Sequence, residues 1–270
     1  MRDHERVTLL AVKLLLAPSF VVGASLVARR YGPRVGGLVA GLPVVAGPIL
    51  LAYALAHGRE FAAGAAAGTL LGLVSLIAFV VVYARLASRA FWAASMLAGW
   101  LAFVAGTAVF SAFSPPLGVA LALAACAVAL GLLWLPRPAG APRAHPAPPS
   151  WDLPLRATCA LALVLTLTAI SGWLGPQLSG LLAPFPIIAT VLATFTHAQR
   201  GPDELLRLLR GLVSGFGAFA LFCFALSLAL AHLSTPAAFA LATALALLAQ
   251  ALVLALMRGD ATRAAAVTEA

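Results

Sequence analysis

The stretch GPRVGGLVAGLPVVAGP, residues 32–48, is apolar enough to lie inside a membrane, yet it is rich in residues that break helices. Proline removes a backbone donor and clashes with the preceding helical turn, and glycine weakens a helix interior. An apolar helix that carries both is expected to be interrupted near its middle. The interruption around Gly41, Pro43 and Pro48 is the feature from which the rest of the chain is interpreted.

The composition places the chain among membrane proteins. Of its 270 residues, 63% are hydrophobic and 9% are charged, which excludes an ordinary soluble domain. The formal net charge of +9 comes from basic residues scattered over short connections, so membrane orientation explains it better than nucleic-acid binding. The cysteines fall in apolar segments without disulfide or zinc-site spacing and are expected to serve in packing: Cys126, Cys159 and Cys223.

A helix needs roughly 20 apolar residues to cross a bilayer, and segments of this kind predict an all-α bundle of about nine transmembrane helices. The first segment is longer than the apolar region of a signal peptide and is expected to be retained. The expected helices cover residues 7–28, 35–57, 61–84, 91–113, 117–135, 153–173, 177–199, 205–230 and 236–257.

Basic residues collect in alternate connections, and such residues favour the cytoplasmic side. This pattern predicts a multi-pass protein with its N-terminus outside and its C-terminus in the cytoplasm. The residues on the expected cytoplasmic side are Arg29, Arg30, Arg34, Arg85, Arg89, Arg137, Arg143, Arg156, Arg200, Arg207, Arg210, Arg258 and Arg263.

The opening stretch occurs twice. GPRVGGLVAGLPVVA (32–46) aligns without a gap with GPQLSGLLAPFPIIA (175–189), and the shift that places Gly32 on Gly175 is called the repeat offset. Such internal similarity predicts a duplication. Identical pairs at the repeat offset, in and beyond this stretch, are Gly32/Gly175, Pro33/Pro176, Gly37/Gly180, Leu38/Leu181, Ala40/Ala183, Pro43/Pro186, Ala46/Ala189, Gly58/Gly201, Gly68/Gly211, Gly72/Gly215 and Phe79/Phe222.

The two copies are expected to have inverted topologies. The first half has an odd number of expected helices, so the second copy enters the membrane from the opposite side, and the loop charges reverse accordingly. The expected organisation is a first membrane repeat (1–135, five helices), a proline-rich cytoplasmic linker (136–152), a second membrane repeat (153–258, four helices) and a cytoplasmic tail (259–270).

Inverted repeats with interrupted helices at corresponding positions indicate a secondary transporter whose site lies near the bilayer midplane. The paired breaks, at Gly41, Pro43 and Pro48 and at Pro184 and Pro186, are the candidate substrate site. A plain kink is the alternative for each proline. The Gly-x-x-x-Gly pairs Gly68/Gly72 and Gly211/Gly215 are instead expected to pack helices together.

Ionisable residues inside a membrane are functional candidates, but every acidic residue lies in a tail or at a helix end, and no buried carboxylate is expected. Lys13 and Arg156 are equivalent cations that either extend toward headgroups or complement an anionic substrate. The remaining polar candidates for the solute site are Tyr53, Thr190, Thr194 and His197. No catalytic, cofactor or metal motif is found, so an enzyme is not expected.

The segment 179–209 resembles the GlpM family of small bacterial inner-membrane proteins. The residues that carry the resemblance are Gly180, Leu181, Phe185, Pro186, Arg200, Gly201, Glu204 and Arg207. The chain looks like a fused, double-length relative, because the first half keeps Gly37, Leu38 and Pro43 but has Leu42 in place of the phenylalanine. The resemblance implies a bacterial inner membrane and no particular substrate.

The sequence therefore favours a secondary transporter of a small solute, with a modest preference for an anion, that works by alternating access. A membrane scaffold without transport activity and a lipid flippase are the alternatives. Membrane lipid is the expected surrounding, nucleic acid is not an expected partner, and the solute, coupling ion and oligomeric state are left open.

Overall fold

The computed structural model describes residues 18–44, 46–113, 115–140, 149–171, 181 and 184–268, and within them every regular element is a helix. Residues 18–31 are helical. The elements that follow are α2 (Pro33–Ala40), α3 (Ala46–His57), α4 (Arg59–Leu86), α5 (Trp92–Ser111), α6 (Leu117–Trp134), α7 (Asp152–Ser171), α9 (Ile187–His232) and α10 (Thr235–Thr268).

Five of these helices are long and apolar enough to cross a membrane: α4, α5, α6, α9 and α10 up to Leu256. The expected segment 35–57 is split into α2 and α3, whereas the expected segments 177–199 and 205–230 meet in α9. The expected segments 7–28 and 177–199 lie partly outside the described residues. The helical fold is confirmed and the long apolar helices indicate a membrane protein, while the count of nine crossings and the inverted repeats stay predictions.

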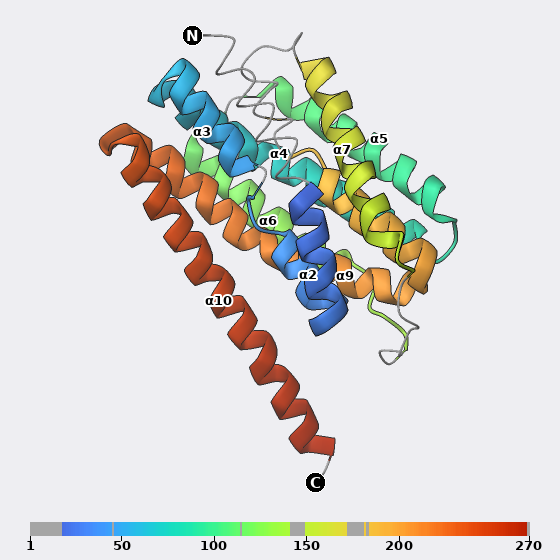
Figure 1. The fold of residues 1–270 in the computed structure, drawn as a ribbon. Helices are drawn as coiled ribbons and strands as arrows, with labels where there is room; N and C mark the ends of the chain where they lie inside the picture. Colours follow the sequence, from blue (N-terminus) through green and yellow to red (C-terminus); the bar gives the residue numbers. More distant parts are fainter. Residues whose placement is uncertain are drawn as a thin grey trace.

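α4 and α9 form the centre of the bundle. In the most apolar window of each, 67% of residues are buried, against 22% or less for α5, α6 and α10. The largest buried side chains, such as Phe79, Tyr83 and Phe216, project from the two central helices. Leu101, on α5, and Leu252, on α10, are exposed, as expected for helices that face lipid. Figure 1 shows α10 alongside α9, with its C-terminal part projecting beyond the bundle.

Two glycines that the repeat offset pairs, Gly58 and Gly201, terminate helices in the same way. Gly58, between α3 and α4, has φ 90° and ψ 171°. Gly201, inside α9, has φ 82° and ψ −179° and divides that element into two helices at a kink. This backbone region is essentially restricted to glycine, so each glycine is required where one helix stops and the next begins.

Candidate functional site: the paired helix breaks

The first break separates α2 from α3. α2 ends at Ala40, where the N–H of Gly41 donates to the carbonyls of Gly37 and Leu38, and the N–H of Leu42 donates to Val39 O. Beyond it, the N–H of Val44 donates to Leu42 O at 2.8 Å, and the N–H of Gly47 donates to Pro43 O at 2.8 Å. The chain thus makes a short turn after Gly41 and restarts as a helix behind Pro43.

The second break has the same hydrogen bonds. The N–H of Ile187 donates to Phe185 O at 2.7 Å, and the N–H of Thr190 donates to Pro186 O at 2.7 Å. The repeat offset pairs each of these four residues with its counterpart in the first break. Pro43 therefore lies between two separate helices, and Pro186 stands just before α9 with the same hydrogen bonds. Most residues just before Pro184 lie outside the described part of the chain, so the interruption of a helix by Pro186 stays a prediction.

The two breaks face each other. A small cavity of about 50 Å³ is lined by residues from both of them together with α4 and α9. Every side chain that lines it in the described part of the chain is apolar: Ala40, Leu42, Pro43, Ala46, Leu76, Pro184, Phe185, Pro186, Ile187, Ile188, Ala189, Leu212, Phe216 and Phe219. The centre of the bundle is therefore nearly filled and has no polar wall.

Glycines let each break lie directly on a helix from the other half. A Cβ added to Gly215 would lie 2.5 Å from Leu38 O and 3.0 Å from Gly41 Cα. A Cβ added to Gly72 would lie 2.5 Å from Leu181 O and 2.5 Å from Pro184 Cγ. Leu181 and Pro184 are the counterparts of Leu38 and Gly41, so the same crossing occurs twice with the halves exchanged.

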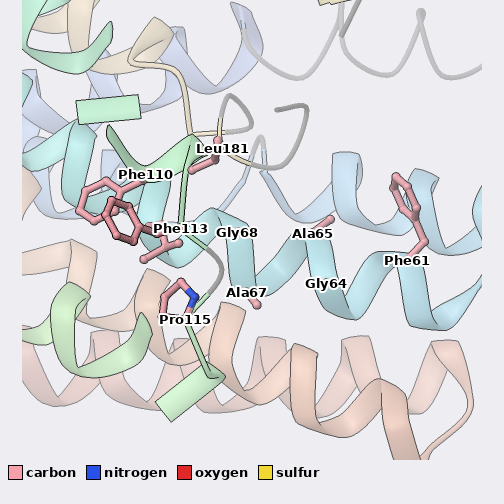
Figure 2. A pocket seen from close by; sticks show the side chains of 10 residues that line it. Phe61, Gly64, Ala65, Ala67, Gly68, Phe110, Phe113, Pro115 and Leu181 are labelled. Atoms are coloured by element: carbon pink, nitrogen blue, oxygen red, sulfur yellow. The ribbon is translucent and has the colours of Figure 1, made fainter. Parts of the chain in front are cut away.

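The other two glycines of the Gly-x-x-x-Gly pairs differ in their surroundings. A Cβ on Gly211 would collide with Arg34 O, so Gly211 also marks a close helix crossing. Gly68 lines a cavity of about 400 Å³ beside α4. Figure 2 shows Gly64, Ala65, Ala67 and Gly68 along α4, with Phe61 at one end and a group of Phe110, Phe113, Pro115 and Leu181 at the other.

A further cavity of about 310 Å³ lies beside the first break, between α3, α9 and α10. It contains two expected site residues, Pro43 and Pro48, and Gly47. Among the described residues that line it, Thr243 is the only one with a polar side chain. The others are Leu42, Val44, Leu51, Phe222, Phe239, Ala246 and Leu247.

The corresponding place in the second half is filled by aromatic side chains. The repeat offset pairs Trp100 with Thr243, Phe103 with Ala246 and Phe185 with Leu42. The Phe185 ring centroid lies 5.9 Å from that of Trp100 and 5.3 Å from that of Phe103. The indole N–H of Trp100 donates to Thr190 Oγ1 at 3.0 Å. Sequence reasoning did not identify Trp100, although the repeat offset could have paired it with Thr243.

The other polar candidates on α9 are turned toward α4 and α5. Thr194 Oγ1 donates to Met96 Sδ at 3.7 Å, and His197 Nδ1 lies 3.5 Å from the hydroxyl of Tyr83, which is fully buried. Tyr53 is apart from them at the end of α3, where its ring packs edge-on against Phe61. These side chains do not converge on one solute site.

The expectation that no carboxylate is buried is wrong. Asp152, at the start of α7, is fully buried, and Arg156 is 6% exposed. Arg156 Nε lies 3.0 Å from both carboxylate oxygens of Asp152, while Arg29 and Gln199 each donate to the same carboxylate at 2.7 Å. Arg29 and Gln199, from neighbouring helices, cover the Asp152 carboxylate. Its position at a helix end therefore did not mean that the side chain was exposed.

Burial tends to raise the pKa of the Asp152 carboxyl, but hydrogen bonds from Gln199 and Arg29 and the charge of Arg156 bring it below its ordinary value of 3.8. Asp152 is therefore ionised at neutral pH and occupies Arg156 as a partner. Arg156 takes part in a buried ion cluster instead of extending freely toward headgroups. Its expected counterpart, Lys13, lies outside the described residues.

Within the described residues, no group of histidine, cysteine and acidic side chains could hold a metal ion. Comparisons with protein-family models, curated proteins and solved structures found no match. The resemblance to the GlpM family therefore stays a prediction.

Proposed function

We propose that the protein is a secondary transporter of the bacterial inner membrane that works by alternating access between two inverted repeats. The observation that carries this proposal is the meeting of two equivalent helix breaks at the centre of the bundle. Broken helices at corresponding positions of two halves are the hallmark of transporter folds that rock around a central site.

The duplication rests on backbone features as well as on sequence. The single repeat offset relates the hydrogen bonds of the breaks, the glycines that end helices at positive φ, and the glycine crossings of Gly72 and Gly215. It also relates the first residues of α5 and α10, Trp92 and Thr235. In the proposed arrangement, α6 is the connecting helix that gives the two copies opposite directions.

The inverted topology agrees with contacts at the helix ends. Arg59 donates to Leu233 O and Arg85 donates to Trp134 O. Each contact joins residues that the alternating charges assign to the same side of the membrane, outside for the first pair and cytoplasmic for the second. The contacts agree with this grouping of helix ends, whereas the orientation with the N-terminus outside and the C-terminus in the cytoplasm rests on the distribution of basic residues alone.

Alternating access requires that the spaces beside the two breaks differ at any moment, so that one is open while the other is closed. The two spaces do differ. The cavity beside Pro43 is open, whereas Trp100, Phe103 and Phe185 occupy the equivalent place near Pro186. We take the chain to be in a state open on the side of the first break. In the opposite state the aromatic group would withdraw from Thr190, and the cavity beside Pro43 would close.

The lining defines the class of solute. A cavity with Thr243 as its single polar side chain among the described residues cannot replace the hydration of a sugar or an inorganic ion. It fits a small organic solute with an apolar body. The basic side chains at the helix ends would attract a solute that also carries a negative charge, so the proposed preference for an anion is retained.

Thiol accessibility tests the proposal in a variant without Cys126, Cys159 and Cys223. Gly41 is unsuitable for a cysteine because an added Cβ would lie 2.7 Å from Leu212 O. Thr243→Cys and Thr190→Cys report instead on the open cavity and its filled counterpart. Membrane-impermeant and lipophilic thiol reagents are applied from each side of oriented vesicles. Ser234→Cys, exposed before α10, is the positive control.

We expect the impermeant reagent to reach Thr243→Cys from outside. Thr190→Cys should react from the cytoplasmic side only when the equilibrium shifts toward the opposite access state. A transported solute or the added change Trp100→Ala should cause that shift. If both positions remain silent to every reagent while Ser234→Cys reacts, the centre is dry and the scaffold alternative replaces transport.

The lipid flippase is a second candidate because the cavities of about 310 and 400 Å³ are lined almost entirely by apolar side chains. Such walls also suit acyl chains. Reaction of Thr243→Cys with the lipophilic reagent but not with the impermeant one would favour this alternative, because lipid rather than water would then fill the cavity.

A further inference from the structure

Three arginines converge on one small cavity at the cytoplasmic ends assigned above. Its volume is about 20 Å³, and it lies between helix 18–31, α2, α7 and α9. No acidic side chain lines it in the described part of the chain. The lining residues are Ser25, Ala28, Arg29, Pro33, Arg156, Leu192, Thr196, Arg200 and Leu208.

The positive charge around this cavity is only partly balanced. Asp152 lies behind the cavity wall and neutralises one charge through its contacts with Arg29 and Arg156. Arg200 forms no ion pair with the described residues and lies close enough to repel Arg156. The four side chains therefore hold two positive charges in excess. Arg156 is 6% exposed, whereas the Arg29 side chain is 27% exposed and Arg200 is half-buried, so water screens this excess only in part.

An unpartnered hydroxyl faces the same space. Ser25 is 3% exposed, lines the cavity, and its Oγ has no hydrogen-bond partner within the described residues. Buried polar groups are nearly always satisfied, and a bound water or ion is one way in which an exception is satisfied. The Ser25 hydroxyl adds a donor to the guanidinium groups, and no carboxylate lines the cavity among the described residues.

We propose that this cavity binds a single halide-sized monovalent anion, with chloride as the physiological example. A cavity of about 20 Å³ has room for one water-sized occupant, which excludes phosphate, sulfate and carboxylates. The donors that surround it are the guanidinium groups of Arg29, Arg156 and Arg200 and the hydroxyl of Ser25. A water molecule would fill the space but leave the excess positive charge uncompensated.

The site is separate from the cavity beside Pro43 and does not depend on transport activity. An anion here would hold helix 18–31, α7 and α9 together, because each contributes a donor. Binding should therefore stabilise the folded protein by mass action.

The purified full-length protein in detergent provides the test. Thermal unfolding, followed by tryptophan fluorescence, is measured in chloride, bromide, sulfate and gluconate at matched ionic strength. ³⁵Cl line broadening reports chloride binding directly. The variants are Arg200→Gln, Ser25→Ala and the matched control Arg89→Gln, which removes an exposed arginine outside the cluster.

We expect a saturable rise of the unfolding midpoint in chloride and bromide but not in gluconate or sulfate. Loss of one charged donor in Arg200→Gln should weaken chloride affinity by about tenfold or more. Ser25→Ala should weaken it less, and Arg89→Gln should behave like the wild type.

Three results overturn the proposal. One is equal midpoints in chloride and gluconate together with no ³⁵Cl broadening. The second is an unchanged chloride affinity in both Arg200→Gln and Ser25→Ala. The third is stabilisation by sulfate or phosphate instead of chloride, which would assign the cluster to a polyatomic ligand such as a lipid phosphate.

Discussion

Alanine at Gly72 and at Gly215 should destabilise the protein to a similar extent, because the two glycines make equivalent crossings. In each case the added Cβ lies 2.5 Å from a backbone carbonyl oxygen, whereas ordinary contact begins at 3.4 Å. The helices must therefore separate by about 0.9 Å. Overpacking of this kind costs about 1–3 kcal/mol, and the upper end applies because a carbonyl cannot rotate away. Alanine recovers about 1 kcal/mol of helix propensity, which leaves a net loss of about 2 kcal/mol at each site.

Gly217→Ala is the matched control, because Gly217 lies on the same helix as Gly215 and an added Cβ there has nothing within 4 Å. It should stabilise the protein slightly. The free energy of unfolding in a mixed-micelle denaturant titration measures all three variants. A loss at Gly215 with control-like behaviour at Gly72 would refute the equivalence of the two crossings, and control-like behaviour at both would refute the close packing.

Three further perturbations test other parts of the fold. Gly58→Ala and Gly201→Ala should each lower the free energy of unfolding by about 1–3 kcal/mol, because their backbone conformation is restricted to glycine; the same titration checks this. Asp152→Asn should cost about 3–5 kcal/mol by leaving Arg156 buried without a partner. Because the pKa of Asp152 is lowered on folding, its stabilisation is complete above the ordinary value of 3.8 and is lost as pH falls further, which acid unfolding of wild type and Asp152→Asn measures. Trp100→Ala should cost about 2–3 kcal/mol, since this half-buried side chain lies below the about 3–5 kcal/mol of a fully buried one; thermal unfolding with Trp100→Phe as the milder variant checks it.

The helix breaks could be predicted from the sequence because their cause is local. Proline removes a donor wherever it stands, so the positions of Pro43 and Pro186 were sufficient to expect interruptions. The packing role of Gly72 and Gly215 followed from their spacing in the same way. Their partners did not, because neither spacing nor composition tells which carbonyl a glycine will meet.

The parts that sequence reasoning missed depend on tertiary contacts. Asp152 looks exposed at a helix end, yet Arg29, from a segment far away in sequence, covers it. Trp100 looks like one apolar residue among many on α5, and its contacts with Phe185 and Thr190 emerge only when α5 packs against the second break. Polar residues at helix ends and single aromatic residues therefore need a neighbour before their environment can be assigned.

In the proposed transporter, the two breaks make similar glycine crossings but have different side chains beside them, and this combination makes an exchange between two states physically reasonable. If the crossings at Gly72 and Gly215 are equivalent, the packing energy lost at one crossing when the halves rock is about equal to the packing energy gained at the other. The difference in energy between the two states then lies mainly in the aromatic group of Trp100, Phe103 and Phe185. A solute that occupies the space these rings vacate would offset their lost contacts, and only such a differential interaction can shift the equilibrium.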